Sequence, residues 1–308
     1  MSVKFENTFG YFGKLPAFND FVKFNAGGDE LLVFDKWLQE GLVSARMKLK
    51  SEWMNYYKVS GQFFFFYPFT GTNKILAGIL IPGWDKSGRE FPFLIFFYLG
   101  KDQLINVPYY LIPVILIDIL KEFKFIAADI SSVTDLSVIN DRLNKITTSI
   151  NNLSDKNNVY QNYITNTLQS SFWNRILDGY DETEKLLFLK NFYISVMRQK
   201  DKTETTLIPF TTDNDHYQDD LTFLIHLAFT FQRNHILPAI FWTSSENKNQ
   251  FLYLFFNKLL AQNYIDLKNR NSNLNINNEW HSNYPITVSI NKIFNKEITL
   301  KEFLKSFN

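Results

Sequence analysis

The chain of 308 residues contains no cysteine. This absence excludes disulfide bonds, metal sites ligated by cysteine and catalysis by a thiol, and it favours a cytoplasmic protein. Glycine is also scarce, at 12 residues. The glycines at Gly10…Gly13 and at Gly27–Gly28 are wrongly spaced for a phosphate-binding loop after a strand. We therefore expect neither a nucleotide site of that kind nor any other cofactor.

The sequence also lacks an excess of charge of either sign. Its 32 Lys and Arg residues nearly balance 31 Asp and Glu residues, which gives a net charge of +1. Proteins that bind nucleic acids need a concentrated basic surface, and no long run of Lys or Arg occurs here. Nucleic acid is therefore not an expected partner.

Long apolar runs are missing as well. The best candidate for a membrane span, residues 104–120, is shorter than the roughly 20 apolar residues that a span needs. It also contains Pro108, Pro113 and Asp118, so it predicts a buried helix and no direct membrane insertion. The first eight residues have no apolar segment behind their basic residue, and we expect no secretory signal there.

Phenylalanine is abundant, at 32 residues, and we interpret most of it as core filling. Residues 62–67, 75–81 and 92–99 are almost continuously apolar, which is typical of strands covered on both faces. Apolar residues spaced by three or four predict a helix over 31–57, broken once. The fold class that follows is α/β, with a central, mostly buried sheet flanked by helices on both faces and a helix-rich C-terminal half.

The other expected elements follow the same patterns. Further helices are expected at 108–125, 135–150, 160–177, 181–197, 218–231 and 246–261, and further strands at 5–12, 205–210 and 237–243.

Two segments carry more specific chemistry than a simple connection needs. Residues 82–93 read as a turn between two buried strands, with turn residues supplied by Asp85 and Gly88. The same turn carries a Trp, a Lys and an Arg. The second segment, residues 13–21, follows the expected first strand.

Together the two segments resemble the TagF family, accessory proteins of the bacterial type VI secretion system. The family's first block is matched by Gly13, Lys14, Leu15, Pro16, Asp20, Phe21 and Val22, and its helical block by Trp37, Leu38 and Gln39. Its turn block is matched by Pro82, Asp85, Gly88, Arg89, Phe91 and Pro92, and a later strand block by Pro238 and Trp242. Asn19, Gly83 and Phe241 depart from the family's usual Gly, Ser and Trp. The resemblance is dense only over the first hundred residues.

On this basis we divide the chain into three parts. Residues 1–128 form a TagF-like α/β region, and residues 129–262 form a helix-rich continuation packed on the same core. Residues 263–308 form an appended polar tail with short elements.

If the two segments meet in space, Asp20 can pair with Arg89 through a bidentate, charge-assisted contact. Arg89 is then either a recognition residue for a partner's carboxylate or phosphate, or one half of a salt bridge that fixes the loop. Lys14 and Asp85 form a second possible pair. Trp84 is either an exposed anchor for a partner or a residue folded back onto the core.

We find no catalytic constellation in the sequence. The run at 213–220 contains His216 and several Asp residues, but it fits an acidic loop that caps the following helix better than a metal site. His226 lies in an apolar helix and is expected to be a core or lining histidine. No Gly-x-Ser-x-Gly pattern occurs. We therefore expect no enzyme and no metal.

The resemblance implies a cytoplasmic, post-translational repressor of type VI secretion. Its expected protein partner is the forkhead-associated scaffold protein Fha or another type VI secretion component. The loop surface around Lys14, Trp84, Asp85 and Arg89 would then dock that partner. A structural adaptor needed to assemble the secretion baseplate or membrane complex is the alternative. An enzyme with an unrecognised site near Asp20 and Arg89 is a third possibility.

Overall fold

The computed structural model describes residues 3–4, 9–59, 61–146, 149–150, 153–199, 205–211, 215–232, 236–244, 249–268 and 285–307. Within these residues the fold is built on one eight-stranded sheet with the order β3-β2-β6-β5-β4-β9-β10-β8, and every neighbouring pair is antiparallel. The strands are β2 (Gly10–Gly13), β3 (Val22–Phe24), β4 (Phe63–Pro68), β5 (Lys74–Ile81), β6 (Phe93–Gly100), β8 (Thr206–Thr211), β9 (Ala239–Thr243) and β10 (Asn249–Phe255). A separate pair joins β1 (Val3–Lys4) to β7 (Ser149–Ile150).

The central strands are buried on both faces, as their continuous apolarity predicts. Successive side chains of a strand point to opposite faces of its sheet. In β4, Phe64 and Phe66 join the larger of two hydrophobic clusters, whereas Phe63 and Phe65 join the smaller. The α/β class with both faces of the sheet covered is thus confirmed.

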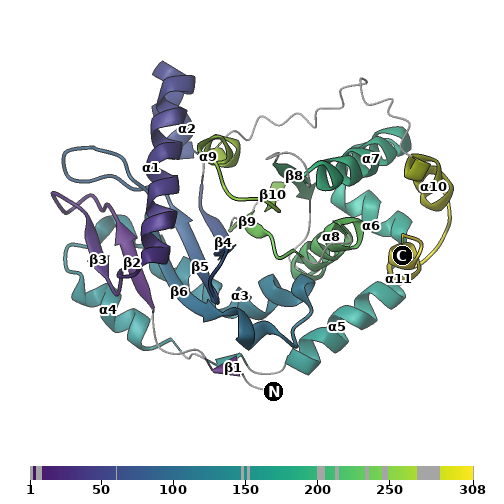
Figure 1. Ribbon diagram of the computed structural model, residues 1–308, viewed down its shortest axis with the longest axis horizontal. Coiled ribbons are helices and arrows are strands. Elements are labelled where there is room, and N and C mark those ends of the chain that lie inside the picture. Colours follow the sequence, from purple (N-terminus) through teal and green to yellow (C-terminus); the bar gives the residue numbers. More distant parts are fainter. Residues whose placement is uncertain are drawn as a thin grey trace.

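Helices from both ends of the chain cover the face that carries the smaller cluster (Figure 1). They are α1 (Asp29–Leu49), α2 (Trp53–Val59) and α9 (Ala261–Lys268). In α1 the buried residues Phe34, Leu38 and Leu42 recur at the helical spacing. The expected break follows at Lys50, where φ is 47° and a short 3-10 helix, η1 (Lys50–Glu52), separates α1 from α2.

The opposite face carries the larger cluster and most of the helices. These are α3 (Ile112–Ala128), α4 (Ser137–Asn144), α5 (Leu153–Asn166), α6 (Gln169–Ile176), α7 (Glu182–Arg198), α8 (Tyr217–Gln232), α10 (Pro285–Phe294) and α11 (Leu300–Lys305). Short 3-10 helices lie at η2 (Lys101–Leu104), η3 (Tyr109–Leu111) and η4 (Ile130–Ser132). The helix-rich C-terminal half is confirmed. No helix in the described part of the chain is both long and apolar enough to traverse a bilayer.

The element expected at 246–261 has the wrong type, the helix expected at 160–177 is divided into α5 and α6, and the helix expected over 135–150 ends at Asn144. The helix predicted over 246–261 is replaced by β10, which pairs with β9 on one side and β8 on the other. Its side chains alternate between the two clusters, with Tyr253 and Phe255 in the smaller and Leu252 and Leu254 in the larger. The polar residues before this strand are typical of a helix start, which explains the wrong prediction. Of these, residues 245–248 lie outside the described residues.

The last segment packs against the larger cluster. Ile290 of α10 and Phe303 of α11 are fully buried there. Residues 269–284, which make up much of the expected polar tail, lie outside the described residues. The three-part division of the chain stays a prediction.

Candidate functional site

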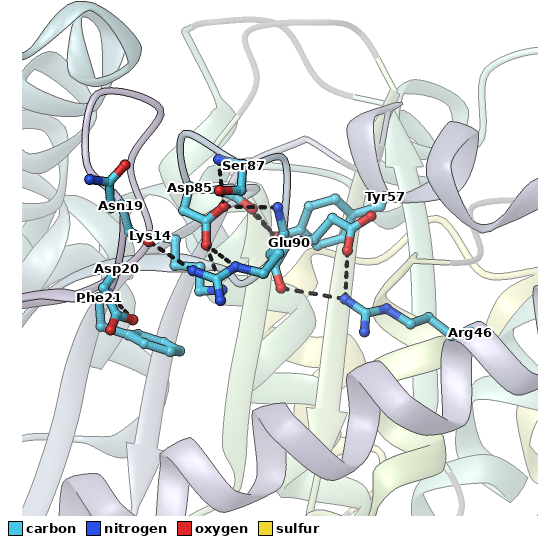
Figure 2. Close-up of polar contacts among 11 residues, drawn as sticks. Lys14, Asn19, Asp20, Phe21, Arg46, Tyr57, Asp85, Ser87 and Glu90 are labelled. Carbon is cyan, nitrogen blue, oxygen red and sulfur yellow. Dashed lines mark hydrogen bonds and ion pairs between the residues drawn. The ribbon is translucent and has the colours of Figure 1, made fainter.

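The two motif segments meet at one end of the sheet. β6 begins at Phe93, and its antiparallel neighbours β2 and β5 both end beside that point. The loop after β2 and the turn between β5 and β6 therefore emerge side by side (Figure 2). Gly13 makes the contact possible, because its φ is +139° and a Cβ there would lie 2.2 Å from the carbonyl oxygen of Pro92.

Asp85 is the centre of this site. Its carboxylate is buried and accepts hydrogen bonds from Lys14 Nζ at 3.0 Å and Arg89 Nε at 2.7 Å, both at Oδ2. The backbone N–H groups of Ser87 and Arg89 donate to Oδ1 at 2.9 and 3.0 Å. Burial opposes ionisation, but these donors outweigh it and lower the pKa of Asp85 to about 2. The expected Lys14–Asp85 pair is confirmed, and Asp85 holds both segments together.

The expected Asp20–Arg89 pair is wrong. Asp20 Oδ1 accepts from the backbone N–H of Phe21 at 2.8 Å, while Arg89 donates from Nη2 to the carbonyl oxygen of Asn19 at 2.8 Å. Asp85 lies four residues before Arg89 inside the same turn and takes the ionic contact instead. The arginine does fix the 13–21 loop, but through a backbone carbonyl that any residue at position 19 supplies.

An aromatic shelf lies beside this cluster. The ring of Phe21 stacks on Phe12 with centroids 5.3 Å apart and meets Phe91 edge-on at 4.8 Å. Lys14 Nζ lies 5.0 Å from the centroid of Phe21. Phe21 nevertheless remains 40% exposed, whereas Phe91 is buried. We call the Asp85 cluster (Lys14, Asp85, Arg89) with this shelf (Phe12, Phe21, Phe91) the platform.

Tyr57 binds the turn that carries part of the platform, a role that the sequence did not indicate. Its hydroxyl donates to the carbonyl oxygen of Gly83 at 2.8 Å and accepts from the N–H of Gly83 at 3.0 Å. A Cβ at position 83 would lie 2.6 Å from the carbonyl oxygens of Lys14 and Phe91, so this packing requires glycine. The helical spacing over 31–57 does not single out Tyr57, because the break at Lys50 changes which side chains face the core.

A second support joins the turn to α1. Arg46 Nη2 lies 2.6 Å from Glu90 Oε2 (Figure 2). The turn is itself closed by an antiparallel bridge between Trp84 and Glu90. Trp84 is half-buried, so its side chain is neither a fully exposed anchor nor part of the core.

Comparison with known proteins identifies the region that holds the platform. Residues 10–115 match the family model described as TagF N-terminal domain, type VI secretion system-associated. Residues 10–115 are thus similar to a TagF N-terminal domain. The domain includes both motif segments and all strands from β2 to β6. It links the protein to type VI secretion.

One solved structure also resembles the chain, the crystal structure of PA0076 from Pseudomonas aeruginosa PAO1. The match has 27% sequence identity and covers 30% of this chain and 42% of that chain, with a TM-score of 0.29. It thus spans about two fifths of that protein and carries no argument about the function of this one. No curated protein matches the chain.

Two tryptophans of the family pattern lie apart from the platform. Trp37, inside the TagF domain, is buried under α9, where its Nε1 donates to the carbonyl oxygen of Leu260 at 2.9 Å. Trp242, outside that domain, is fully buried in β9 against Phe64. Both serve the core. Of the other pattern residues, Pro16, Pro82, Gly88 and Pro92 lie on the two segments that carry the platform.

The acidic run near α8 has a structural partner. Asp220 is buried in the first turn of α8, where Arg175 and Tyr163 bind its carboxylate. The expected loop role is therefore wrong for this residue, and residues 212–214 lie outside the described residues. Among the residues that the structure describes, no three His, Asp or Glu side chains are grouped to hold a metal ion.

His226 is half-buried and lines the core, which agrees with the expectation of a core or lining histidine. Its ring stacks on Tyr110 with centroids 3.9 Å apart, and its Nδ1 lies 2.9 Å from the hydroxyl of Tyr160. Burial lowers the pKa of His226 to about 4, so the ring is neutral at pH 7.

Proposed function

We propose that the protein is a non-catalytic, cytoplasmic regulator of a type VI secretion system that represses secretion by binding the forkhead-associated scaffold Fha. The match to the TagF N-terminal domain carries this proposal. The platform is the surface on which we place the contact, because it is formed by the two segments that bear the family pattern.

The construction of the platform suits docking better than catalysis. Asp85 is surrounded by donors and held ionised, so it is a poor general base near neutral pH. Arg89 and Lys14 are cations with no basic group beside them that is poised to take a proton. Exposed arginine and phenylalanine on a rigid support are the side chains that dominate protein interfaces.

Deletion of the gene tests the direction of regulation. A repressor's loss raises the amount of secreted type VI substrate in the culture medium, and complementation with the wild-type gene lowers it again. A structural adaptor's loss abolishes secretion, and that result would overturn the repressor proposal.

Calorimetric titration of the purified protein with purified Fha tests the partner. We expect a saturable one-to-one interaction that weakens when Arg89 is changed to Gln. Absence of binding, together with raised secretion in the deletion strain, would keep the repressor role and reject Fha as the partner.

A further inference from the structure

The platform has a fixed cation directed at solvent. A guanidinium carries five N–H donors. In Arg89, Nε donates to Asp85 and Nη2 to the carbonyl oxygen of Asn19, and the other three N–H groups meet no acceptor among the described residues. The side chain is 61% exposed. Because Asp85 and Asn19 already hold the guanidinium in place, binding a ligand costs it little further entropy.

The charge around Arg89 favours an anion. Four cationic side chains and three carboxylates lie on the two segments and on β3, which leaves a net positive charge of one; they are Lys14, Lys23, Lys86, Arg89, Asp20, Asp85 and Glu90. Of the carboxylates, Glu90 is already paired with Arg46 of α1. Lys23 is exposed and directly opposite Phe12 in the β2–β3 register, so it lies on the same face as the aromatic shelf. Lys86 is exposed on the turn.

An apolar contact lies beside the cation. Lys14 Nζ is 3.0 Å from Asp85 Oδ2, the atom that also accepts from Arg89, and 5.0 Å from the centroid of Phe21. The exposed ring of Phe21 is thus next to the ammonium of Lys14, which shares the acceptor Asp85 Oδ2 with the exposed guanidinium of Arg89. A ligand that engages both needs an anion and an apolar group close together.

The backbone of the turn distinguishes a carboxylate from a phosphate. Phosphate sites commonly use several backbone N–H groups that point at the ligand. Here the N–H groups of residues 86–89 are all used internally, by the carbonyl oxygens of Phe18 and Asp85 and by the carboxylate of Asp85. What remains is the planar fork of Arg89, whose geometry matches a carboxylate.

We propose that Arg89 and Phe21 together bind an acidic segment of a partner protein, in which an Asp or Glu carboxylate lies next to an aromatic or large apolar side chain. The carboxylate receives the open N–H groups of Arg89, and the apolar side chain packs on the ring of Phe21. Lys23 and Lys86 add long-range attraction that salt weakens. The inference rests on the proposed function in assuming a protein partner at the platform.

Short synthetic peptides test this chemistry without any assumption about the partner's identity. The acidic probe is acetyl-Asp-Phe-Glu-amide, and its uncharged match is acetyl-Asn-Phe-Gln-amide. Titration of isotope-labelled protein, followed by NMR, should shift the signals of Arg89 and Phe21 with the acidic peptide, at a Kd on the order of 1 mM. The uncharged peptide should bind about tenfold more weakly, because it cannot form the ion pair.

Matched variants separate recognition from stability. Arg89→Gln and Phe21→Ala should each weaken the acidic peptide at least about fivefold. The controls are Arg142→Gln, a partly exposed arginine on α4, and Phe125→Ala, a more exposed phenylalanine on α3, and neither should change the Kd. Thermal unfolding of each variant verifies that it is folded.

The outcomes are distinguishable. Equal binding of the acidic and uncharged peptides, or unchanged binding in folded Arg89→Gln protein, would overturn the inference. If a phosphoserine peptide binds more than about tenfold more tightly than the acidic peptide, the ligand of Arg89 is a phosphate, and the carboxylate proposal is overturned. If the acidic peptide binds at Arg89 and Fha does not bind at all, the inference stands and the proposed partner fails.

Discussion

The platform and the helical half each contain a buried aspartate bound by an arginine, but the two arginines differ in what they leave exposed. Asp85 and Asp220 both have fully covered carboxylates. Arg175, which binds Asp220 from Nε at 3.1 Å and Nη2 at 2.7 Å, is 21% exposed. Arg89 contacts Asp85 through Nε and is 61% exposed.

The difference lies in how the carboxylate is shared. Asp220 accepts from two nitrogens of one arginine and from the hydroxyl of Tyr163, and these residues connect α5, α6 and α8. Asp85 divides its acceptors among Lys14, Arg89 and the backbone of the turn. The Asp220–Arg175 contact thus joins helices to one another, whereas the Asp85–Arg89 contact positions a cation at the surface.

Removal of the interior carboxylate should have the largest effect on stability. Asp220→Ala leaves Arg175 and Tyr163 covered without their acceptor, and breaking such a pair costs about 3–5 kcal/mol. Urea unfolding followed by circular dichroism measures the loss.

The neighbouring Asp219 provides the control. Burial, and then the charge of Asp220, raises the pKa of Asp219, so its ionised form is disfavoured in the folded protein. Asp219→Asn should therefore cause no loss of stability at pH 7. Equal losses in the Asp219 and Asp220 variants would show that the acidic pair, and not the Arg175 contact, stabilises this region.

Removal of the platform carboxylate should have the next largest effect. Asp85→Ala leaves the ammonium of Lys14 buried without its counter-ion, and we expect a loss of about 3 kcal/mol. Binding of the acidic peptide should also weaken, because the guanidinium of Arg89 loses its support. Unchanged stability together with unchanged binding would contradict the central position given to Asp85.

The sequence predicts the platform's location better than its contacts. Continuous apolarity identifies the buried strands, and their antiparallel order brings the two polar segments to one end of the sheet. The sequence does not show whether Asp20 or Asp85 is the partner of Arg89, because the choice depends on the backbone path of the turn. Tyr57 was missed because a single residue with positive φ, Lys50, alters the helical register. β10 was missed because the polar residues before it are typical of a helix start, although β9, one of its two partners, is the preceding strand.

The two regions should also differ in their response to acid. The pKa of His226 is lowered to about 4 in the folded protein, so the unfolded chain binds a proton first as the pH falls. His226 therefore costs stability between pH about 6.5 and about 4, up to about 3 kcal/mol. The pKa of Asp85 is lowered to about 2, so its contribution is lost only between pH about 4 and about 2.

The variant His226→Phe should flatten the first of these windows and leave the second unchanged. Urea unfolding of the wild type and the variant at a series of pH values from about 7 down to about 2 measures both. The variant keeps an aromatic ring against Tyr110 but removes the partner of the Tyr160 hydroxyl, so a constant loss of stability is expected at all pH values. A variant whose stability falls with acid as steeply as that of the wild type would show that another group titrates.

Replacement of the exposed arginine should have the smallest effect on stability. Arg89→Gln removes an ionic contact whose cation is mostly solvated, and such contacts contribute about 1 kcal/mol or less. Arg175→Gln, the equivalent change in the helical half, should cost several times more, since it removes both Arg175 contacts from the fully buried carboxylate of Asp220. Thermal and urea unfolding of the two variants side by side measures the ratio. If Arg89→Gln is as destabilising as Arg175→Gln, Arg89 stabilises the fold in the same way as Arg175. Recognition at the platform must then depend on Phe21 and the lysines.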